Sequence, residues 1–302
     1  MCPIVRSENA PTDHDSLLVL INPISGRGEG RRVAQRIRHI FHQEGLTAEV
    51  MLLSAPGEAS SLIAQQAAGH AAVVAVGGDG TMNEVAAAMY HQAIRRPLGL
   101  IPLGLSNCLA RHWGHPLVLT DAIRVIKQGR TQSIPLAIVR DRVVLAFLGA
   151  GLDAAIARRV ALKRQGTVRD WDYVKAAAVT MVNHEWTGIS VEVDGRLIPG
   201  RFFQILLSPI TNYAHFFSFP EGPGFRIYLF RDRGHISLIH VLPRLGRSRD
   251  LSRVCDRMIP VHERLRIWSD QAPVYLQMDG EAGGSLPVEC EIKPNALELF
   301  VP

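Results

Sequence analysis

The sequence predicts an α/β protein: a doubly wound parallel-sheet domain at the amino terminus, then a mostly antiparallel, β-sandwich-like second domain. Up to Gly129, short apolar runs without helical period alternate with amphipathic segments, which is the pattern of repeated strand–helix units. After Gly129 strands dominate, and several alternate in polarity, as half-exposed antiparallel strands do. The 302 residues, 47% hydrophobic and 20% charged, suffice for two domains with their own cores, which we place at 1–130 and 131–302.

The elements of the first domain follow from apolar runs and helical spacing. Residues 71–76 are apolar throughout, as expected for a parallel strand that is buried on both faces. Apolar residues in 31–41 recur at helical spacing, which predicts an amphipathic helix. The expected strands are 17–21, 48–53, 71–76 and 98–102, and the expected helices are 31–41, 57–68 and 82–90. Ligands of such sheets bind at the carboxyl ends of the strands, where the segments after Ile21, Val76 and Ile101 lie.

The second domain is predicted from eight strand-like runs. They are residues 136–139, 143–148, 189–193, 201–207, 225–230, 265–268, 274–278 and 297–301. Asp194-Gly195 is a typical two-residue hairpin turn. Helical patterns interrupt the strands at about 153–182 and 236–258.

The amino-acid composition limits the kinds of partner that the chain is expected to bind. A formal net charge of +5 favours nucleotide phosphates, nucleic acid or an anionic membrane surface. Aromatic residues make up only 6% and do not interleave with a basic run, so we expect no nucleic-acid partner. The chain shows no signal-peptide pattern and no apolar run of ~18 residues, and its cysteines have no paired spacing. We therefore expect a cytoplasmic protein that is peripheral at the membrane, and a homodimer is left open.

The segment Gly77-Gly78-Asp79-Gly80-Thr81 is the strongest local signal. It follows a buried strand and precedes a helix. Glycines let backbone amides approach phosphate oxygens, and a helix N-terminus offers free N–H groups and a positive dipole end. Asp79 suits a magnesium ion, its waters or a reacting hydroxyl better than a direct phosphate contact. The alternative is a tight strand–helix turn that Asp79 or Thr81 caps.

Three further segments share features of sites and of ordinary turns. Residues 22–30 form a Gly-rich turn after the first strand, and residues 101–111 follow the fourth. Neither matches a standard nucleotide fingerprint. Asp279-Gly280-Glu281 places two carboxylates near a strand end, where they can bind a metal or accept a proton. A β-turn with a central glycine is the alternative for that triplet.

Together these segments resemble the diacylglycerol kinase catalytic family, which includes bacterial lipid kinases, sphingosine kinases and ceramide kinases. The resemblance runs from residue 17 to 302. Its ordered motifs are Asn-Pro-x-Ser-Gly from Asn22, Gly-Gly-Asp-Gly-Thr-x-Asn-Glu from Gly77, Pro-Leu-Gly from Pro102, Gly-x-Gly-x-Asp-Ala from Gly149 and Asp-Gly-Glu from Asp279. Gly-Gly-Asp-Gly-Thr alone is shared with NAD kinases, whereas Asn83-Glu84 and the Asn-Pro-x-Ser-Gly start favour the lipid branch.

The resemblance implies an ATP-dependent kinase that transfers the γ-phosphate, with Mg²⁺, to a hydroxyl of diacylglycerol or a related lipid. It implies an active site between the two domains. Glu281, beside Asp279, would take the acceptor proton, and Asp79 is the third candidate catalytic residue. The implied ATP-binding residues are Asn22, Pro23, Ile24, Ser25, Gly26, Gly77, Gly78, Asp79, Gly80, Thr81, Met82, Asn83, Glu84 and Asn107.

The chain departs from the family pattern at three positions. After Pro-Leu-Gly the family usually has Thr and then Asn-Asp, but here Leu105 stands at the first position and Cys108 follows Asn107. The family often has an Asp-Gly-x-x-Asp-like metal site in the second domain. In residues 219–226 Glu221 is the acidic residue that remains, so it is the metal candidate, and Arg226 stands near the lost aspartate.

Four alternatives stay open. The chain could be an NAD-kinase-like enzyme, or a catalytically impaired protein that binds nucleotide or lipid on the same scaffold. Cys108, His112 and His115 have a spacing that could bind zinc. The arginines of 231–257 interleave with apolar residues, so that segment could lie on an anionic membrane or form a solvated helix face.

Overall fold

The computed structural model describes residues 5–6, 16–28, 30–162, 176, 179–180, 188–213, 217–232, 243–244, 247–271 and 273–302. The chain forms two compact units, Met1–Leu136 with Pro294–Pro302, and Ala137–Lys293. It passes between them inside two strands, β6 (Arg130–Val139) and β18 (Val288–Phe300). The sequence placed one division near residue 130. The carboxyl-terminal residues group with the first unit because Leu299 of β18 pairs with Leu98.

The first unit has the parallel sheet that the sequence predicts. Its order is β3-β2-β4-β5, and the end of β18 lies parallel beside β5. The strands are β2 (Ser16–Ile21), β3 (Thr47–Leu52), β4 (Ala72–Gly77) and β5 (Leu98–Pro102). β1 (Val5–Arg6) pairs antiparallel with β6. All residues of β4 and β5 are buried, as parallel strands covered on both faces should be.

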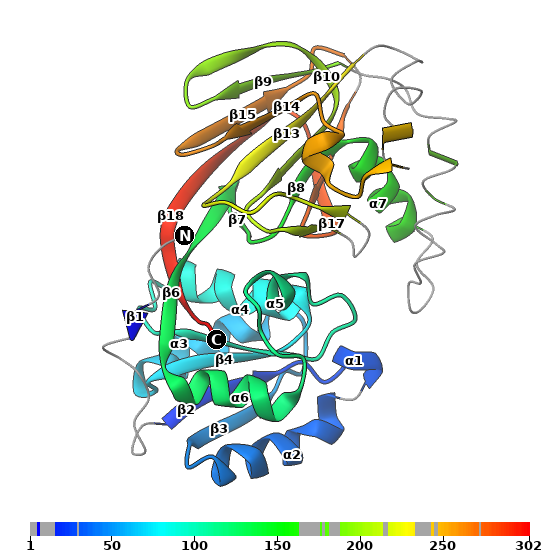
Figure 1. Ribbon diagram of the computed structural model, residues 1–302. Helices are drawn as coiled ribbons and strands as arrows, with labels where there is room; N and C mark the ends of the chain where they lie inside the picture. The colour runs from blue at the N-terminus through cyan, green and yellow to red at the C-terminus, as the bar shows by residue number, and fades with distance from the viewer. Residues whose placement is uncertain are drawn as a thin grey trace. The chain divides into compact units, whose positions relative to one another are not determined.

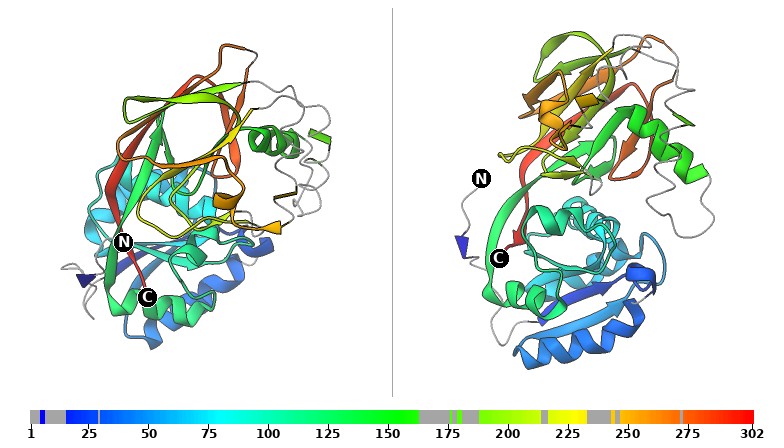
Figure 2. Two further views of the ribbon diagram at one scale, coloured as in Figure 1. Left: turned by 45° about the horizontal axis from the view of Figure 1, so that its top comes forward. Right: turned by 45° about the vertical axis from the view of Figure 1, so that its right-hand side comes forward.

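Helices cover both faces of this sheet (Figures 1 and 2). The amphipathic helices α2 (Gly30–Gln43) and α6 (Leu119–Gln128) pack their apolar sides on one core with β2 and β4. α3 (Glu58–Gln66) and α4 (Asp79–His91) pack together, with α4 against β4. The short elements are α1 (Ser25–Gly28), the 3₁₀ turn η1 (Ala67–Gly69) and α5 (Cys108–His112).

The second unit is mostly antiparallel strands, as predicted. Its order is β17-β16-β8-β10-β9-β15-β18, and β13 pairs with β10 and β14. The bounds are β7 (Arg142–Val144), β8 (Leu148–Gly151), β9 (Ile189–Val193), β10 (Arg196–Ser208), β11 (Asn212–Tyr213), β12 (Phe217–Ser218), β13 (Arg226–Arg231), β14 (Arg257–Pro260), β15 (Arg264–Trp268), β16 (Tyr275–Met278) and β17 (Glu281–Ser285). α7 (Leu152–Leu162) packs against β16 and β17, and η2 (Leu251–Arg253) is a 3₁₀ turn.

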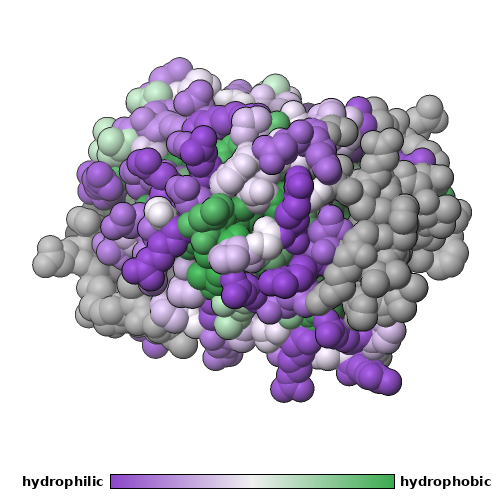
Figure 3. Space-filling model, turned by 90° about the horizontal axis from the view of Figure 1, so that it is seen from above, coloured by the Kyte–Doolittle hydropathy of each residue, from purple (hydrophilic) through white to green (hydrophobic). Residues whose placement is uncertain are grey.

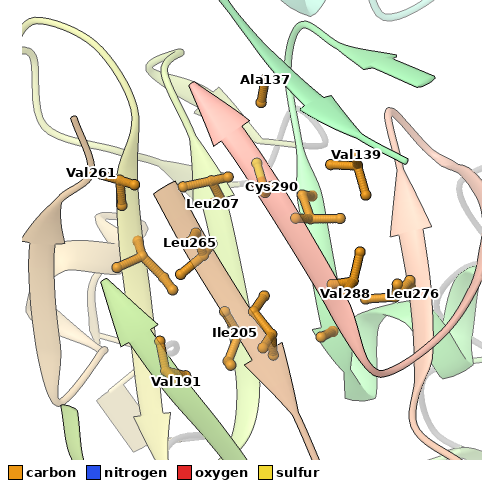
Figure 4. Close-up of a cluster of buried hydrophobic side chains, with 14 of the residues drawn as sticks. Ala137, Val139, Val191, Ile205, Leu207, Val261, Leu265, Leu276, Val288 and Cys290 are labelled. Carbon is orange, nitrogen blue, oxygen red and sulfur yellow. The ribbon is translucent and has the colours of Figure 1, made fainter. Parts of the chain in front are cut away.

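One apolar cluster holds these strands together (Figure 4). It takes Val191 from β9, Ile205 and Leu207 from β10, Leu265 from β15 and Leu276 from β16. These side chains are almost wholly buried. Because alternate residues of each strand face the cluster, the period-2 pattern in the sequence is what builds this core.

The structure corrects several predicted elements. α4 begins at Asp79 and not at Met82, so Asp79, Gly80 and Thr81 form its first turn. The run 143–148 is broken into β7 and β8, because the N–H groups of 145–147 bind a carboxylate and not a neighbouring strand. β18 begins at Val288 and not near 297, since alternate residues from there are buried.

Of the helix predicted at 236–258, the described residues 243, 244 and 247 are helical, but the helix does not extend to 258. Residues 251–253 form one 3₁₀ turn, and β14 continues as a strand that pairs with β13. The apolar residues expected within that helix, at 236–242 and 245, lie outside the described residues, as does most of 163–182. Among the described residues, no helix is long and apolar enough to span a membrane.

Candidate active site

Three loops meet at the carboxyl edge of the first unit's sheet. Asn22, at the end of β2, donates from Nδ2 to Thr81 Oγ1 at 3.0 Å, and its backbone N–H donates to Val76 O at 3.0 Å. Leu103 N, after β5, donates to Gly77 O at 2.8 Å. The predicted Asn22 and Thr81 are therefore joined by a direct hydrogen bond, and the predicted Gly77 is bonded to the β5 loop through Leu103.

Glycines allow the close approach of these loops. A Cβ added at Gly78 would lie 3.2 Å from the Cα of Gly104, and one at Gly26 would lie 2.7 Å from Leu103 O. A Cβ at Gly77 would overlap the side chain of Thr81. Gly80, in contrast, is exposed and has open space around it. The first turn of α4 thus presents backbone to solvent at Gly80, at a helix end where N–H groups lack partners within the helix.

Asp79 is engaged by a neighbouring helix. Its Oδ2 accepts from Cys108 N at 3.0 Å and its Oδ1 from Leu109 N at 2.9 Å, so it caps the start of α5. Asn107 adopts the left-handed conformation before that helix, with φ 48°. Its side chain binds both the N–H and the carbonyl of Gly104, at 3.0 and 2.8 Å. Asp79 and Asn107 therefore fix the loop that follows β5.

The other predicted nucleotide residues differ in their surroundings. Met82 is fully buried, and Glu84 Oε1 accepts from Gly57 N at 2.9 Å, at the start of α3. Pro23 and Ser25 are half-buried, whereas Ile24 is 76% exposed and donates its N–H to Asn22 Oδ1 at 3.1 Å. Asn83 lies in α4 and is half-buried. Met82 and Glu84 thus support the first unit's packing.

In the second unit, Asp279-Gly280 forms the turn between β16 and β17. Both residues have positive φ, 49° and 87°, which is the geometry of a two-residue hairpin. The Asp279 carboxylate accepts from Leu145 N at 2.9 Å, Ala146 N at 2.8 Å and Phe147 N at 2.7 Å. Asp279 thus anchors the turn, and it leaves Glu281 as the carboxylate that faces solvent.

Glu281 opens β17 and is paired with an arginine. Its side chain is 74% exposed, and Arg142 Nη2 donates to its Oε2 at 3.0 Å. Arg142 Nη1 also binds Ala282 O at 3.0 Å, and Arg140 Nη2 binds Ser285 O at 2.7 Å. Two arginines from the β6–β7 hairpin therefore hold the outer side of β17. Neither arginine is among the predicted site residues, although the pattern Arg140-Asp141-Arg142 between two apolar runs is a signal for such a pair.

Glu221 and Arg226 do not form a metal site. Glu221 is exposed, and Arg226 Nη1 donates to its backbone carbonyl at 3.1 Å. Arg226 Nη2 binds Gly222 O at 2.7 Å, so a guanidinium fills this loop. Among the described residues, no three His, Cys, Asp or Glu side chains gather in a way that could hold a metal. The described residues therefore do not fit a Mg²⁺ ion that is held by protein side chains alone.

The zinc alternative has no support in the described part of the chain. His115 is 4% exposed, and its Nε2 lies 2.7 Å from Phe300 O. Burial lowers the pKa of His115 to about 4, against the backbone hydrogen bond to Phe300, which raises it. The ring is thus a neutral packing element of the first unit.

Comparisons with known proteins find similarity to diacylglycerol kinases and related lipid kinases. The model of the diacylglycerol kinase catalytic domain matches residues 16–139. A diacylglycerol kinase from Staphylococcus epidermidis is 23% identical over 293 residues, covering 94% of this chain and 91% of that protein. A Yersinia pestis protein named "Probable lipid kinase YegS-like" is 37% identical over 125 residues, covering 40% of this chain and 41% of that protein.

A solved structure of a diacylglycerol kinase from Bacillus anthracis has the same fold. Its TM-score is 0.74 at 16% identity, and the match covers 97% of this chain and 99% of that chain. Residues 16–139 match the diacylglycerol kinase catalytic domain, and the fold of the chain is that of the solved diacylglycerol kinase structure.

Proposed function

We propose that the chain is an ATP-dependent lipid kinase that transfers the γ-phosphate of ATP to a hydroxyl of diacylglycerol or a related lipid. The observation that carries this proposal is the start of α4. Gly78 follows β4, Asp79 to Thr81 form the first turn of α4, and loops from β2 and β5 are hydrogen-bonded around this helix N-terminus. Backbone N–H groups and the positive end of a helix dipole stabilise phosphate groups at such a position.

On the nucleotide side, the chain supplies positioning and not covalent chemistry. Phosphoryl transfer depends mainly on the alignment of the reacting groups and on neutralisation of charge. Asn22 and Thr81 fix the β2 loop against α4, while Asp79 and Asn107 fix the β5 loop. Magnesium enters this proposal with the nucleotide, as the complex in which ATP is supplied, because the described residues do not build a metal site of their own.

On the acceptor side, Glu281 is the proposed general base. A lipid hydroxyl is a poor nucleophile until its proton is accepted, and a positioned base typically contributes ~10²–10⁴-fold to the rate. Glu281 suits this role because its carboxylate is exposed, while the guanidinium of Arg142 restrains one of its oxygens. Asp279 has the supporting role, since three backbone N–H groups hold its carboxylate.

The surface is compatible with an apolar ligand. The face shown in Figure 3 has an apolar area that hydrophilic residues surround. Exposed apolar patches of this kind often mark binding sites. Arg244 and Arg253, in the predicted basic segment, lie 4.0 Å from Asp256 and 3.4 Å from Asp250. Recruitment to an anionic membrane and a homodimer stay predictions.

One observation favours a second candidate, a binding protein without transfer activity. Asp79 already accepts two backbone N–H groups, and the buried Cys108 stands where the family has a carboxylate. Such a protein would bind ATP and leave every hydroxyl acceptor unmodified.

The test is ADP formation with Mg²⁺-ATP against separate acceptors: diacylglycerol, a sphingoid base, ceramide, a prenol and NAD. The proposal expects acceptor-dependent ADP with at least one lipid and none with NAD. ADP formed only with NAD would mean an NAD-kinase-like enzyme. ATP binding without ADP from any acceptor would support the binding protein and reject the kinase.

A further inference from the structure

The second unit contains two Asp-Gly hairpins of the same design. Asp194 and Asp279 both have φ 49°, and the glycines that follow have φ 77° and 87°. Each aspartate accepts three consecutive backbone N–H groups, from residues 262–264 and 145–147 respectively. Each also donates its own N–H to the third residue's carbonyl, at 2.8 Å. The hairpin at Asp194 is thus an internal control for the one that carries Glu281.

The second hairpin has one further set of contacts. Gly280 N donates to Gln277 Oε1 at 2.9 Å, and Gln277 Nε2 donates to Asp153 Oδ2 at 3.1 Å. Asp153 Oδ1 accepts from Gln204 Nε2 at 2.7 Å. Gln277 and Gln204 are only 3% and 6% exposed. In the described part of the chain, the N–H of Gly195 has no such side-chain acceptor.

The glycines of the Gly-x-Gly-x-Asp-Ala motif leave room for the contact between Asp153 and Gln277. Gly149 lies opposite Gln277 in the pairing of β8 with β16, and a Cβ at Gly149 would overlap the carboxylate of Asp153. A Cβ at Gly151 would overlap the carbonyl of Phe203. The glycine at 149 therefore leaves the space through which Asp153, at the start of α7, reaches β16.

We propose that Asp153 is a positioning residue: through Gln277 it holds the Asp279-Gly280 turn, and with it the backbone from which Glu281 projects. This inference rests on the proposed role of Glu281. A carboxylate only accepts hydrogen bonds, so Asp153 turns the amide group of Gln277 with Nε2 toward itself. Oε1 then faces the N–H of Gly280. The hairpin at Asp194 folds without such a network, and burying polar groups costs free energy, which indicates a role beyond forming the turn.

The test exchanges donor and acceptor in the hydrogen bond between Gln277 and Asp153. In Asp153→Asn we expect the remaining oxygen to keep the two donors that bind Oδ1, Ala154 N and Gln204 Nε2, both at 2.7 Å. The amide donor then lies opposite Gln277 Nε2, so Gln277 must lose that partner or turn its own donor toward Gly280. Asp153→Asn combined with Gln277→Glu restores the pairing, because the carboxylate introduced at position 277 accepts from both the amide introduced at position 153 and Gly280 N. The double variant also keeps the net charge of the natural protein.

Two readouts are measured on the full chain. Amide hydrogen exchange compares Gly280 with Gly195, and steady-state kinetics uses the lipid acceptor identified above with Mg²⁺-ATP. In Asp153→Asn we expect exchange at Gly280 to rise about tenfold, the equivalent of one typical net hydrogen bond, with Gly195 unchanged. We expect kcat to fall by a similar factor with ATP affinity unchanged, and the double variant to recover both.

Unchanged exchange at Gly280 in Asp153→Asn would overturn the proposal. So would normal kcat despite faster exchange, or a double variant no better than the single one. If a single variant does not fold, recovery of folded protein in the double variant supports the proposal that Asp153 holds the turn through Gln277. If the natural protein phosphorylates no acceptor, the proposed function fails, while the exchange comparison still decides whether Asp153 holds the turn.

Discussion

Replacing Asp279 by Ala should destabilise the second unit far more than replacing Asp194 by Ala. The two aspartates make the same three backbone contacts in the same turn geometry. Any strain of Ala at φ 49° is therefore common to both variants. What differs is the exposure of the N–H groups that lose their acceptor.

The structure sets the size of this difference. Leu145, Ala146 and Phe147, which bind Asp279, are 1%, 3% and 8% exposed. A buried donor without an acceptor costs ~1–3 kcal/mol, so three such donors at the low end cost about 3 kcal/mol. Residues 262–264, which bind Asp194, are exposed, and water can replace the lost carboxylate at a cost of about 1 kcal/mol or less.

Differential scanning calorimetry of both variants and the natural protein measures this difference. About 2 kcal/mol corresponds to a melting temperature roughly 4–8 °C lower for Asp279→Ala than for Asp194→Ala. Equal melting temperatures would refute the reasoning, because they would mean that the anchored N–H groups of 145–147 are not buried in solution. Asp279→Ala should also lower activity, because it releases the turn that precedes Glu281. Glu281→Gln, in contrast, should lower activity while the melting temperature stays unchanged.

Three further predictions concern other residues. Asp79→Ala removes the acceptor of the Cys108 and Leu109 N–H groups at the start of α5, so we expect loss of turnover and a stability loss of about 1 kcal/mol, which is typical of a helix cap. Full activity in a steady-state assay would contradict a role of Asp79 in the site. Burial lowers the pKa of His115 from 6.5 in the unfolded chain to about 4 in the folded protein, so between these pH values only the unfolded state binds a proton. The contribution of neutral His115 to the free energy of unfolding should therefore be fully present above pH 6.5 and fall by roughly 3 kcal/mol toward pH 4. Thermal melts of His115→Gln across this range should lack that part of the decline, and a parallel decline would show that other groups cause it. Burial raises the pKa of the Cys290 thiol to about 12, so iodoacetamide at pH 8 should label Cys290 only after unfolding. Rapid labelling of Cys290 in the native protein, seen by mass spectrometry, would place this thiol at the surface.

The first unit was predictable because its signals are local. The strand at 98–102 matches β5, since apolar runs of that length between turn residues have one common solution in an α/β sheet. The glycine motif from Gly77 was found for a similar reason: glycines are required where backbones approach, as at Gly78 and Gly104.

The second unit was less predictable because its support comes from distant residues. β17, with the sequence Glu-Ala-Gly-Gly-Ser, has little strand propensity. It forms because β16 pairs with it and because Arg140 and Arg142 bind its carbonyls. The anchoring of Asp279 could not be read either, since its partners at 145–147 are far away in sequence.

Transfer of label from γ-labelled ATP into an organic-extractable lipid tests the kinase assignment most directly. The natural protein should produce labelled lipid in the presence of Mg²⁺. Glu281→Gln keeps the shape of the side chain and removes its charge, so it should produce at least about a hundredfold less label, at nearly unchanged ATP affinity. Glu289→Gln, which changes another exposed glutamate of the second unit, should label lipid like the natural protein. Absence of labelled lipid with every acceptor, or equal labelling by Glu281→Gln, would contradict this assignment of function and base.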